Sequence, residues 1–253
     1  MSRKNWVAIA IGTILVALMV VGCWPGNRMS NQVLENNGHA IAVMPLGDSI
    51  TKGPYTPGGY RLPLWQMLVE EDGYAIDLVG SLQDGPPELP DRDHEGHSGW
   101  RIDQIRKRIA GWLRRSQPEV VVLLIGTNDM AQGYQLDTAA QRWLALIRDI
   151  HQQQPQTSIL VGSLPPLEDP TLNERVEAFN VAIADLAARE RSNNVPLTFV
   201  DIYDYVSVDQ LADGIHPNRE GYRQIATAWR SPLAEILDRR PNTPEENAAR
   251  FFQ

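Results

Sequence analysis

The chain contains a single cysteine among its 253 residues, so no disulfide bond can form within it. It lacks the G-x-S-x-G nucleophile elbow of the α/β-hydrolases, the G-x-x-x-x-G-K-S/T phosphate loop and the G-x-G-x-x-G dinucleotide fingerprint. Positive charge is also in deficit, because 23 Lys and Arg residues face 31 Asp and Glu residues for a formal net charge of −8. Nucleic acid and anionic membrane faces are therefore unfavourable partners.

The composition is that of an ordinary globular domain, with 43% hydrophobic and 21% charged residues. Five short apolar runs predict buried strands: 41–44, 76–79, 120–125, 159–161 and 197–200. Between these strands lie segments whose apolar residues recur at helical spacing, for example Ile102, Ile105 and Ile109. Because strands that alternate with helices need crossover connections, we expect a three-layer α/β/α domain around a five-stranded parallel sheet.

Polar residues follow three of these five runs. In a parallel sheet, ligands bind beyond the carboxyl ends of the strands. Ser49 comes shortly after the first run, Asn128 after the third, and the pair Asp213 and His216 after the fifth. A hydroxyl, an amide and a carboxylate–imidazole pair are the parts needed for acyl transfer. We therefore interpret Ser49 as the nucleophile, His216 as its base, Asp213 as the group that orients His216, and Asn128 as an oxyanion donor.

A second Asp–His pair competes with this assignment. Asp91 and His94 have the same spacing as Asp213 and His216 and lie in a polar segment, 91–97. The two histidines of that segment could also bind a metal ion. A segment of this composition is more often a solvated or hydrogen-bonded polar loop. The spacing alone does not decide between the two pairs.

With these residues the chain resembles the SGNH/GDSL hydrolases, over about 39–239. The resemblance implies a flavodoxin-like SGNH fold with no cofactor and no metal. The family's remaining glycine completes the oxyanion hole with the backbone N–H of Ser49 and the amide of Asn128. Gly80 and Gly99 compete for this role, and we prefer Gly99 because it directly precedes the helix expected near Ile102. Three blocks match in family order: Gly47-Asp48-Ser49-Ile50-Thr51, Gly126-Thr127-Asn128-Asp129 and Asp213-x-x-His216-Pro217.

Two further stretches, 94–100 and 58–61, resemble the acetylxylan-esterase branch of the carbohydrate esterases. This resemblance implies an esterase for short acetyl groups on small-molecule or glycan esters. Two other functions are alternatives to this esterase. One is a lysophospholipase or thioesterase that acts on longer acyl chains, and the other is a non-catalytic glycan-binding lipoprotein. Lys52 departs from the family pattern and leaves the substrate open. Candidate substrate-binding residues are Asp48, Tyr60, Arg61 and Trp100.

The amino-terminal residues have the pattern of a secretory signal. Arg3 and Lys4 precede an apolar run from Trp6 to Gly22, which is slightly short for a membrane span. Cys23 follows directly, and this arrangement resembles the lipobox of bacterial lipoproteins, whose cysteine is lipidated. An uncleaved signal anchor is the alternative. We predict an extracytoplasmic protein, periplasmic or at the cell surface, that meets the membrane only through this lipid or anchor. Its parts are a signal peptide at 1–22, a tether at 23–38 and a hydrolase domain at 39–253.

The lipid attachment is testable by mass spectrometry of the mature protein expressed in a bacterium. We expect Cys23 at the N-terminus with acyl chains attached, because a thiol at this position is the group that is alkylated. Detection of Met1 as the first residue, or of an unmodified Cys23, would instead support the signal anchor.

Overall fold

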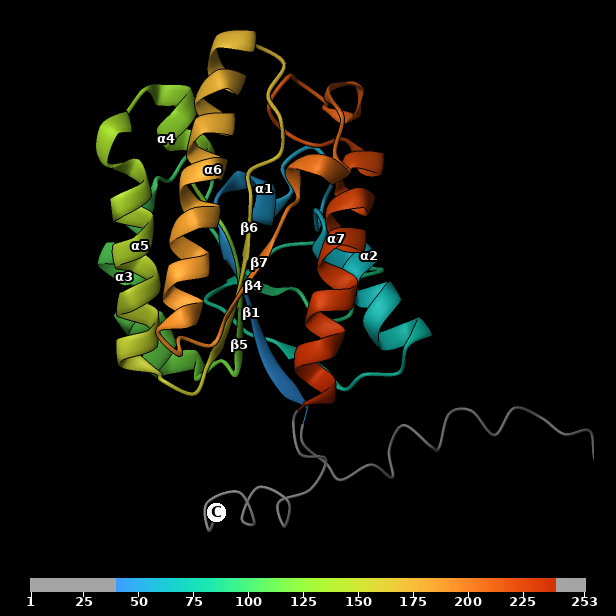
Figure 1. Ribbon diagram of the computed structural model, residues 1–253. Helices are drawn as coiled ribbons and strands as arrows, with labels where there is room; N and C mark the ends of the chain where they lie inside the picture. Colours follow the sequence, from blue (N-terminus) through green and yellow to red (C-terminus); the bar gives the residue numbers. More distant parts are fainter. Residues whose placement is uncertain (1–39, 240–253) are drawn as a thin grey trace, which may run out of the picture.

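The structure is a computed structural model that describes residues 40–239 (Figure 1). The expected signal peptide, the tether and Cys23 lie outside the described residues, so these remain predictions. Within 40–239, no helix is both long enough and apolar enough to cross a membrane.

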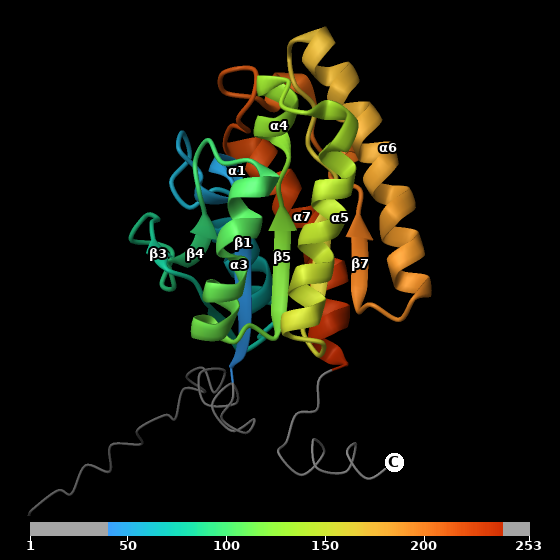
Figure 2. The same cartoon turned by 90° about the vertical axis from the view of Figure 1, so that its left-hand side faces the viewer.

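A mainly parallel sheet forms the middle layer. Its strands run in the order β3-β4-β1-β5-β6-β7, and β2 also pairs with β1. Among the described strands, β3 and β4 pair in antiparallel fashion and the other pairs are parallel. Figure 2 shows the arrowheads of β4, β5 and β7 pointing the same way, toward α1 and α4. The strands are β1 Ile41–Gly47, β2 Ile76–Leu78, β3 Leu82–Gln83, β4 Asp93–Gly96, β5 Val120–Leu124, β6 Ser158–Gly162 and β7 Leu197–Val200.

Helices cover both faces of the sheet. Figure 1 shows α3, α5 and α6 on one face, and α7 with α2 on the other. This arrangement confirms the predicted three layers, in which the apolar stripe of each helix is buried against the sheet. The helices are α1 Ser49–Lys52, α2 Arg61–Trp65 with a π-helical continuation Gln66–Glu71, α3 Ile102–Ser116, α4 Thr127–Gln132, α5 Leu136–Gln153, α6 Pro170–Ser192 and α7 Arg219–Asp238. Two 3₁₀ turns, Tyr203–Tyr205 and Val208–Gln210, precede α7.

The five predicted strands all form, as β1, β2, β5, β6 and β7, but the expected strand number was wrong. The described sheet has seven strands, because β3 and β4 extend it beyond β1. Strand β4 has the sequence Asp-His-Glu-Gly, which we interpreted as a polar loop. Its His94 and Glu95 side chains are polar but buried: His94 Nδ1 accepts the Gly96 N–H, and Glu95 accepts the N–H of Ser81, so hydropathy alone gives no sign of a strand there.

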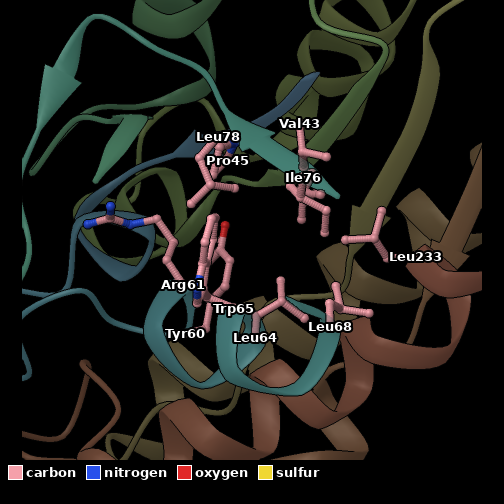
Figure 3. Close-up of a pocket in the computed structure, with 11 residues that line it drawn as sticks. Val43, Pro45, Tyr60, Arg61, Leu64, Trp65, Leu68, Ile76, Leu78 and Leu233 are labelled. Carbon is pink, nitrogen blue, oxygen red and sulfur yellow. The ribbon is translucent and has the colours of Figure 1, made fainter. Parts of the chain in front are cut away.

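A small apolar cavity of about 20 Å³ lies between the sheet and the helices α2 and α7 (Figure 3). Val43, Leu78, Leu68 and Leu233 are among the residues that line it. The volume is close to that of a single water, and the apolar lining gives a water no partner, so we interpret it as a packing gap. None of the candidate catalytic residues lines it.

Candidate active site

The nucleophile candidate begins a helix at the carboxyl end of β1. Asp48 caps α1 by accepting a hydrogen bond from the Ile50 N–H at 2.9 Å. A side chain at Gly47 would overlap the carbonyl oxygen of Leu124 and the hydroxyl of Thr51, so only glycine permits the strand to pass this close to β5. Ser49 is therefore fixed at the edge of the sheet where ligands bind, with 7% of its surface exposed.

A hydrogen-bonded relay joins Ser49 to the loop before α7. The Ser49 Oγ lies 2.8 Å from His216 Nε2, and His216 Nδ1 lies 2.9 Å from Asp213 Oδ2. Because a carboxylate can only accept a hydrogen bond, Nδ1 carries the proton and Nε2 is free to accept the serine hydroxyl. Ser49 and His216 are 167 positions apart in sequence. The fold brings them together with Asp213 in the arrangement that a serine nucleophile needs.

Asp213 is held in its charged form. Partial burial alone would raise its pKa, but three hydrogen bonds oppose that effect. They come from the backbone N–H of His216 at 2.8 Å, from the His216 ring, and from the backbone N–H of Ile215 at 3.1 Å. Together they lower the pKa of Asp213 to about 2, so the residue opposite His216 is an anion throughout the neutral range.

Asn128 connects the other two segments of the site. Its Nδ2 donates to the carbonyl oxygen of Trp100 at 2.9 Å and to Asp48 Oδ2 at 3.3 Å. Trp100 follows Gly99, and Asp48 precedes Ser49, so the amide lies beside both backbone positions proposed for the oxyanion hole. At Gly99 the backbone has φ +78, a conformation that favours glycine. A side chain there would meet no atom within 4 Å, so the backbone conformation, and not lack of space, favours glycine at this position.

Gly80, the competing glycine, is placed differently. It packs against the backbone of His94, between β2 and β3, and a side chain there would overlap that backbone. The three atoms nearest to such a side chain all belong to His94, whereas Asn128 bonds to Trp100, next to Gly99.

The competing Asp91–His94 pair does not form. The carboxylate of Asp91 accepts hydrogen bonds from the backbone N–H groups of Leu78 and Asp93 at 2.6 and 3.2 Å. His94 is fully buried, its Nδ1 accepts the Gly96 N–H at 2.9 Å, and its Nε2 lies 3.5 Å from Asp84. Burial, helped by the nearby Arg61 charge, lowers the pKa of His94 to about 3. His94 is thus a neutral core residue, and the described residues hold no cluster of three or more metal-ligating side chains.

Comparison with known proteins agrees with this geometry. Residues 46–224 match the model of the GDSL-like Lipase/Acylhydrolase family. The chain belongs to this family.

Within this family, the chain is similar to carbohydrate and acetyl esterases. The fold superposes on a Clostridium thermocellum family 3 carbohydrate esterase with a TM-score of 0.72 and 34% identity, covering 79% of this chain and 98% of that one. An acetyl esterase mutant with an acetate ion gives a TM-score of 0.69 and 27% identity, covering 78% and 98%. A multidomain esterase of Ruminococcus flavefaciens is 28% identical over 234 residues, and the chain covers 30% of that protein's length.

Three of the four side chains predicted to bind substrate are buried in this GDSL hydrolase and have partners within the protein. Asp48 and Tyr60 are fully buried and Arg61 is 1% exposed. Asp48 is occupied as the cap of α1, and the Tyr60 hydroxyl lies 3.3 Å from the Thr51 hydroxyl. The guanidinium of Arg61 donates only to backbone carbonyl oxygens, those of Thr51, Lys52, Asp84 and Arg92. It links the end of α1 to the β3–β4 hairpin and does not reach solvent.

Trp100, the fourth, is half-buried in a stack of rings. Its ring lies 4.3 Å from the His97 ring, whose other neighbour is Trp112 at 4.7 Å. His97 Nε2 bonds to the buried Glu95 carboxylate at 2.8 Å, and the His97 N–H donates to the Gly47 carbonyl oxygen at 2.9 Å. The stack therefore holds the Gly99 turn against the end of β1.

Sequence reasoning missed Tyr55. Its ring is 60% exposed and its centroid lies 5.4 Å from that of the His216 ring. The pKa of Tyr55 is raised, because its hydroxyl is hydrogen-bonded to the Asp213 carboxylate and lies near that negative charge. The available signal was an aromatic residue between two prolines, six positions after the candidate nucleophile.

Two buried carboxyl groups lie beneath the site. Burial raises the pKa of Asp48 to about 7, partly opposed by the Ile50 N–H and reinforced by the neighbouring Asp129. Burial also raises the pKa of Asp129 to about 6, although Arg142 forms an ion pair with it at 2.9 Å. Both groups therefore hold protons in the folded protein at a pH where they would be ionised in the unfolded chain.

This difference predicts a pH dependence of stability. The contribution of Asp48 is fully present below about pH 4 and is lost as the pH rises through about 7. The free energy of unfolding in urea should fall over this range in the wild type, and the fall should be smaller in Asp48→Asn, which keeps the helix cap but cannot ionise. Equal slopes for the two proteins between pH 4.5 and 7.5 would show that Asp48 is not protonated in the folded state.

Proposed function

We propose that this hydrolase is a serine esterase that removes acetyl and other short acyl groups from carbohydrate, using Ser49, His216 and Asp213 as its triad. The observation that supports the triad is the continuous hydrogen-bonded relay from Ser49 through His216 to the ionised Asp213. The likeness to a carbohydrate esterase and to an acetyl esterase supports the substrate class.

In the first half of the reaction, Ser49 Oγ attacks the ester carbonyl carbon while its proton passes to His216 Nε2. The negative charge that develops on the carbonyl oxygen is stabilised by the backbone N–H groups of Ser49 and Gly99 and by the Asn128 amide. Asp213 stabilises the imidazolium. The carbon–oxygen bond to the sugar then breaks, His216 returns the proton to the leaving oxygen, and the acyl group remains on Ser49.

In the second half, water replaces the alcohol. His216 takes a proton from the water, whose oxygen attacks the acyl carbon, and the same oxyanion donors stabilise the intermediate. The bond to Ser49 Oγ breaks, His216 returns the proton to that oxygen, and the carboxylic acid leaves. The chain's own groups supply every proton transfer, so the cycle closes with no further reactant.

The surroundings of the site favour a short acyl group. The apolar cavity in Figure 3 is lined by none of Ser49, Asn128 and His216, so this cavity does not hold an acyl chain that is attached to the nucleophile. Tyr55 and Asp213 border the site, and both present polar atoms. Such a border suits a hydroxyl-rich sugar better than a lipid tail.

Loss of the nucleophile tests the mechanism. Ser49→Ala is expected to lower kcat on p-nitrophenyl acetate by about 10⁴-fold or more, because no other group accepts the acyl chain. His216→Ala should be comparably damaging. His94→Asn, which keeps an acceptor for the Gly96 N–H, should retain most of the rate if the protein folds normally by circular dichroism. An active Ser49→Ala protein is incompatible with the triad.

Asn128 is expected to act on the transition state. Asn128→Ala should lower kcat by about 10²–10³-fold with little change in KM, the usual effect of losing one oxyanion donor. Steady-state kinetics would reveal a substrate-binding role instead if KM rose and kcat stayed constant.

Substrate class is tested with p-nitrophenyl esters of increasing chain length, together with acetylated xylan and lysophosphatidylcholine. We expect kcat/KM to fall steeply beyond butyrate and acetate to be released from the glycan, because the apolar cavity does not include Ser49 and polar groups of Tyr55 and Asp213 border the site. A maximum at long acyl chains, with the lysophospholipid cleaved faster than acetylated xylan, would support a lysophospholipase or thioesterase.

A further inference from the structure

We infer that Tyr55 forms the platform on which the sugar ring of the substrate stacks, directly beside the base that protonates the departing sugar oxygen. The inference rests on the proposed function and goes beyond it by naming the residue that recognises the alcohol half of the ester.

The position of Tyr55 carries the argument. Tyr55, Leu136, Val181, Tyr205 and Val208 are the large apolar side chains that stand out as exposed in the described part of the chain. Among these five, Tyr55 has its ring against His216, at 5.4 Å between centroids and 55° between planes. An aromatic face left in water at the edge of a reaction site is available to a ligand.

The reaction itself brings a sugar to this face. His216 Nε2 must protonate the leaving oxygen, so that oxygen approaches Nε2 to about 3 Å. The sugar carbon bonded to it then lies next to the imidazole, and the rest of the pyranose ring extends over the neighbouring surface. Tyr55 occupies that surface. The apolar C–H face of a pyranose packs on an aromatic ring, while its hydroxyl groups remain in water.

The ring of Tyr55 is held in place before substrate arrives. Its loop begins where α1 ends, with the Gly53 N–H donating to the Ser49 carbonyl oxygen at 2.8 Å. The Gly59 N–H donates to the Thr56 carbonyl oxygen at 2.7 Å, and Gly53 packs directly on Gly59. A side chain on Gly53 would overlap Gly59, and φ is +81 at Gly53. The loop is therefore closed at its base, and a preorganised platform loses little entropy on binding.

Trp100 is less suited to this role. One face of its ring is stacked on His97, and the side chain packs against the hydrophobic core. Tyr55 is 60% exposed, and its ring lies 5.4 Å from that of the base His216.

The test compares two alcohols on the same acetyl group. Tyr55→Ala, Tyr55→Phe and the exposed-tyrosine control Tyr205→Ala are assayed with ethyl acetate and with mono-acetylated xylobiose. Tyr55→Ala should lose about tenfold more in kcat/KM on the sugar ester than on ethyl acetate, mainly through KM. Tyr55→Phe, which keeps the ring, should retain the preference for the sugar ester, and Tyr205→Ala should match the wild type on both.

The possible failures are distinguishable. Equal losses on both esters in Tyr55→Ala would overturn the platform and show that Tyr55 acts through Asp213 and His216. A Tyr55→Phe protein as impaired as Tyr55→Ala on the sugar ester would overturn it too, because the hydroxyl would then be the group that matters. A wild-type protein that cleaves ethyl acetate but no sugar acetate would instead refute the proposed carbohydrate specificity, and the platform with it.

Discussion

The parts of the active site depend on how three strands meet at Gly47. On one side Gly47 pairs with Gly96 of β4, and on the other it pairs with Leu124 of β5. The His97 N–H adds a hydrogen bond to the Gly47 carbonyl oxygen. Because these pairings align the strand ends, the chain reaches the same edge of the sheet in all three places. Ser49, Gly99 and Asn128 follow the aligned residues by only a few positions each.

A layer of buried polar groups supports this edge from below. Asp48, Glu95 and Arg61 are almost wholly inaccessible, and each is satisfied by groups within its own neighbourhood. Removing such a charge from water is costly unless hydrogen bonds replace the solvent, and here backbone atoms supply most of them. Most polar side chains beneath Ser49 therefore stabilise the fold, and few polar side chains remain free to contact a substrate.

The sequence predicted the main strands and the relay better than it predicted the surface. Runs such as 120–125 are apolar throughout, and their burial on both faces makes them readable. Strand β4 could not be recognised, because His94 and Glu95 are polar residues whose burial depends on partners remote in sequence. Asp213–His216 and Asp91–His94 share one spacing, and only the fold shows which histidine reaches Ser49. Tyr60 and Arg61 were candidates for substrate binding and lie in the core, while the sequence pattern offered no reason to single out the exposed Tyr55 nearby.

His216 of the relay belongs to the last loop before α7, whereas Ser49 belongs to α1, directly after the first strand of the domain. Asn218 caps α7 by accepting the N–H groups of Glu220 and Gly221, and Tyr222 and Trp229 bury the helix against the rest of the domain. During synthesis, the serine therefore emerges long before the histidine that activates it. Under the proposed mechanism, hydrolysis needs both residues, so we expect the onset of ester hydrolysis during refolding to report the docking of α7.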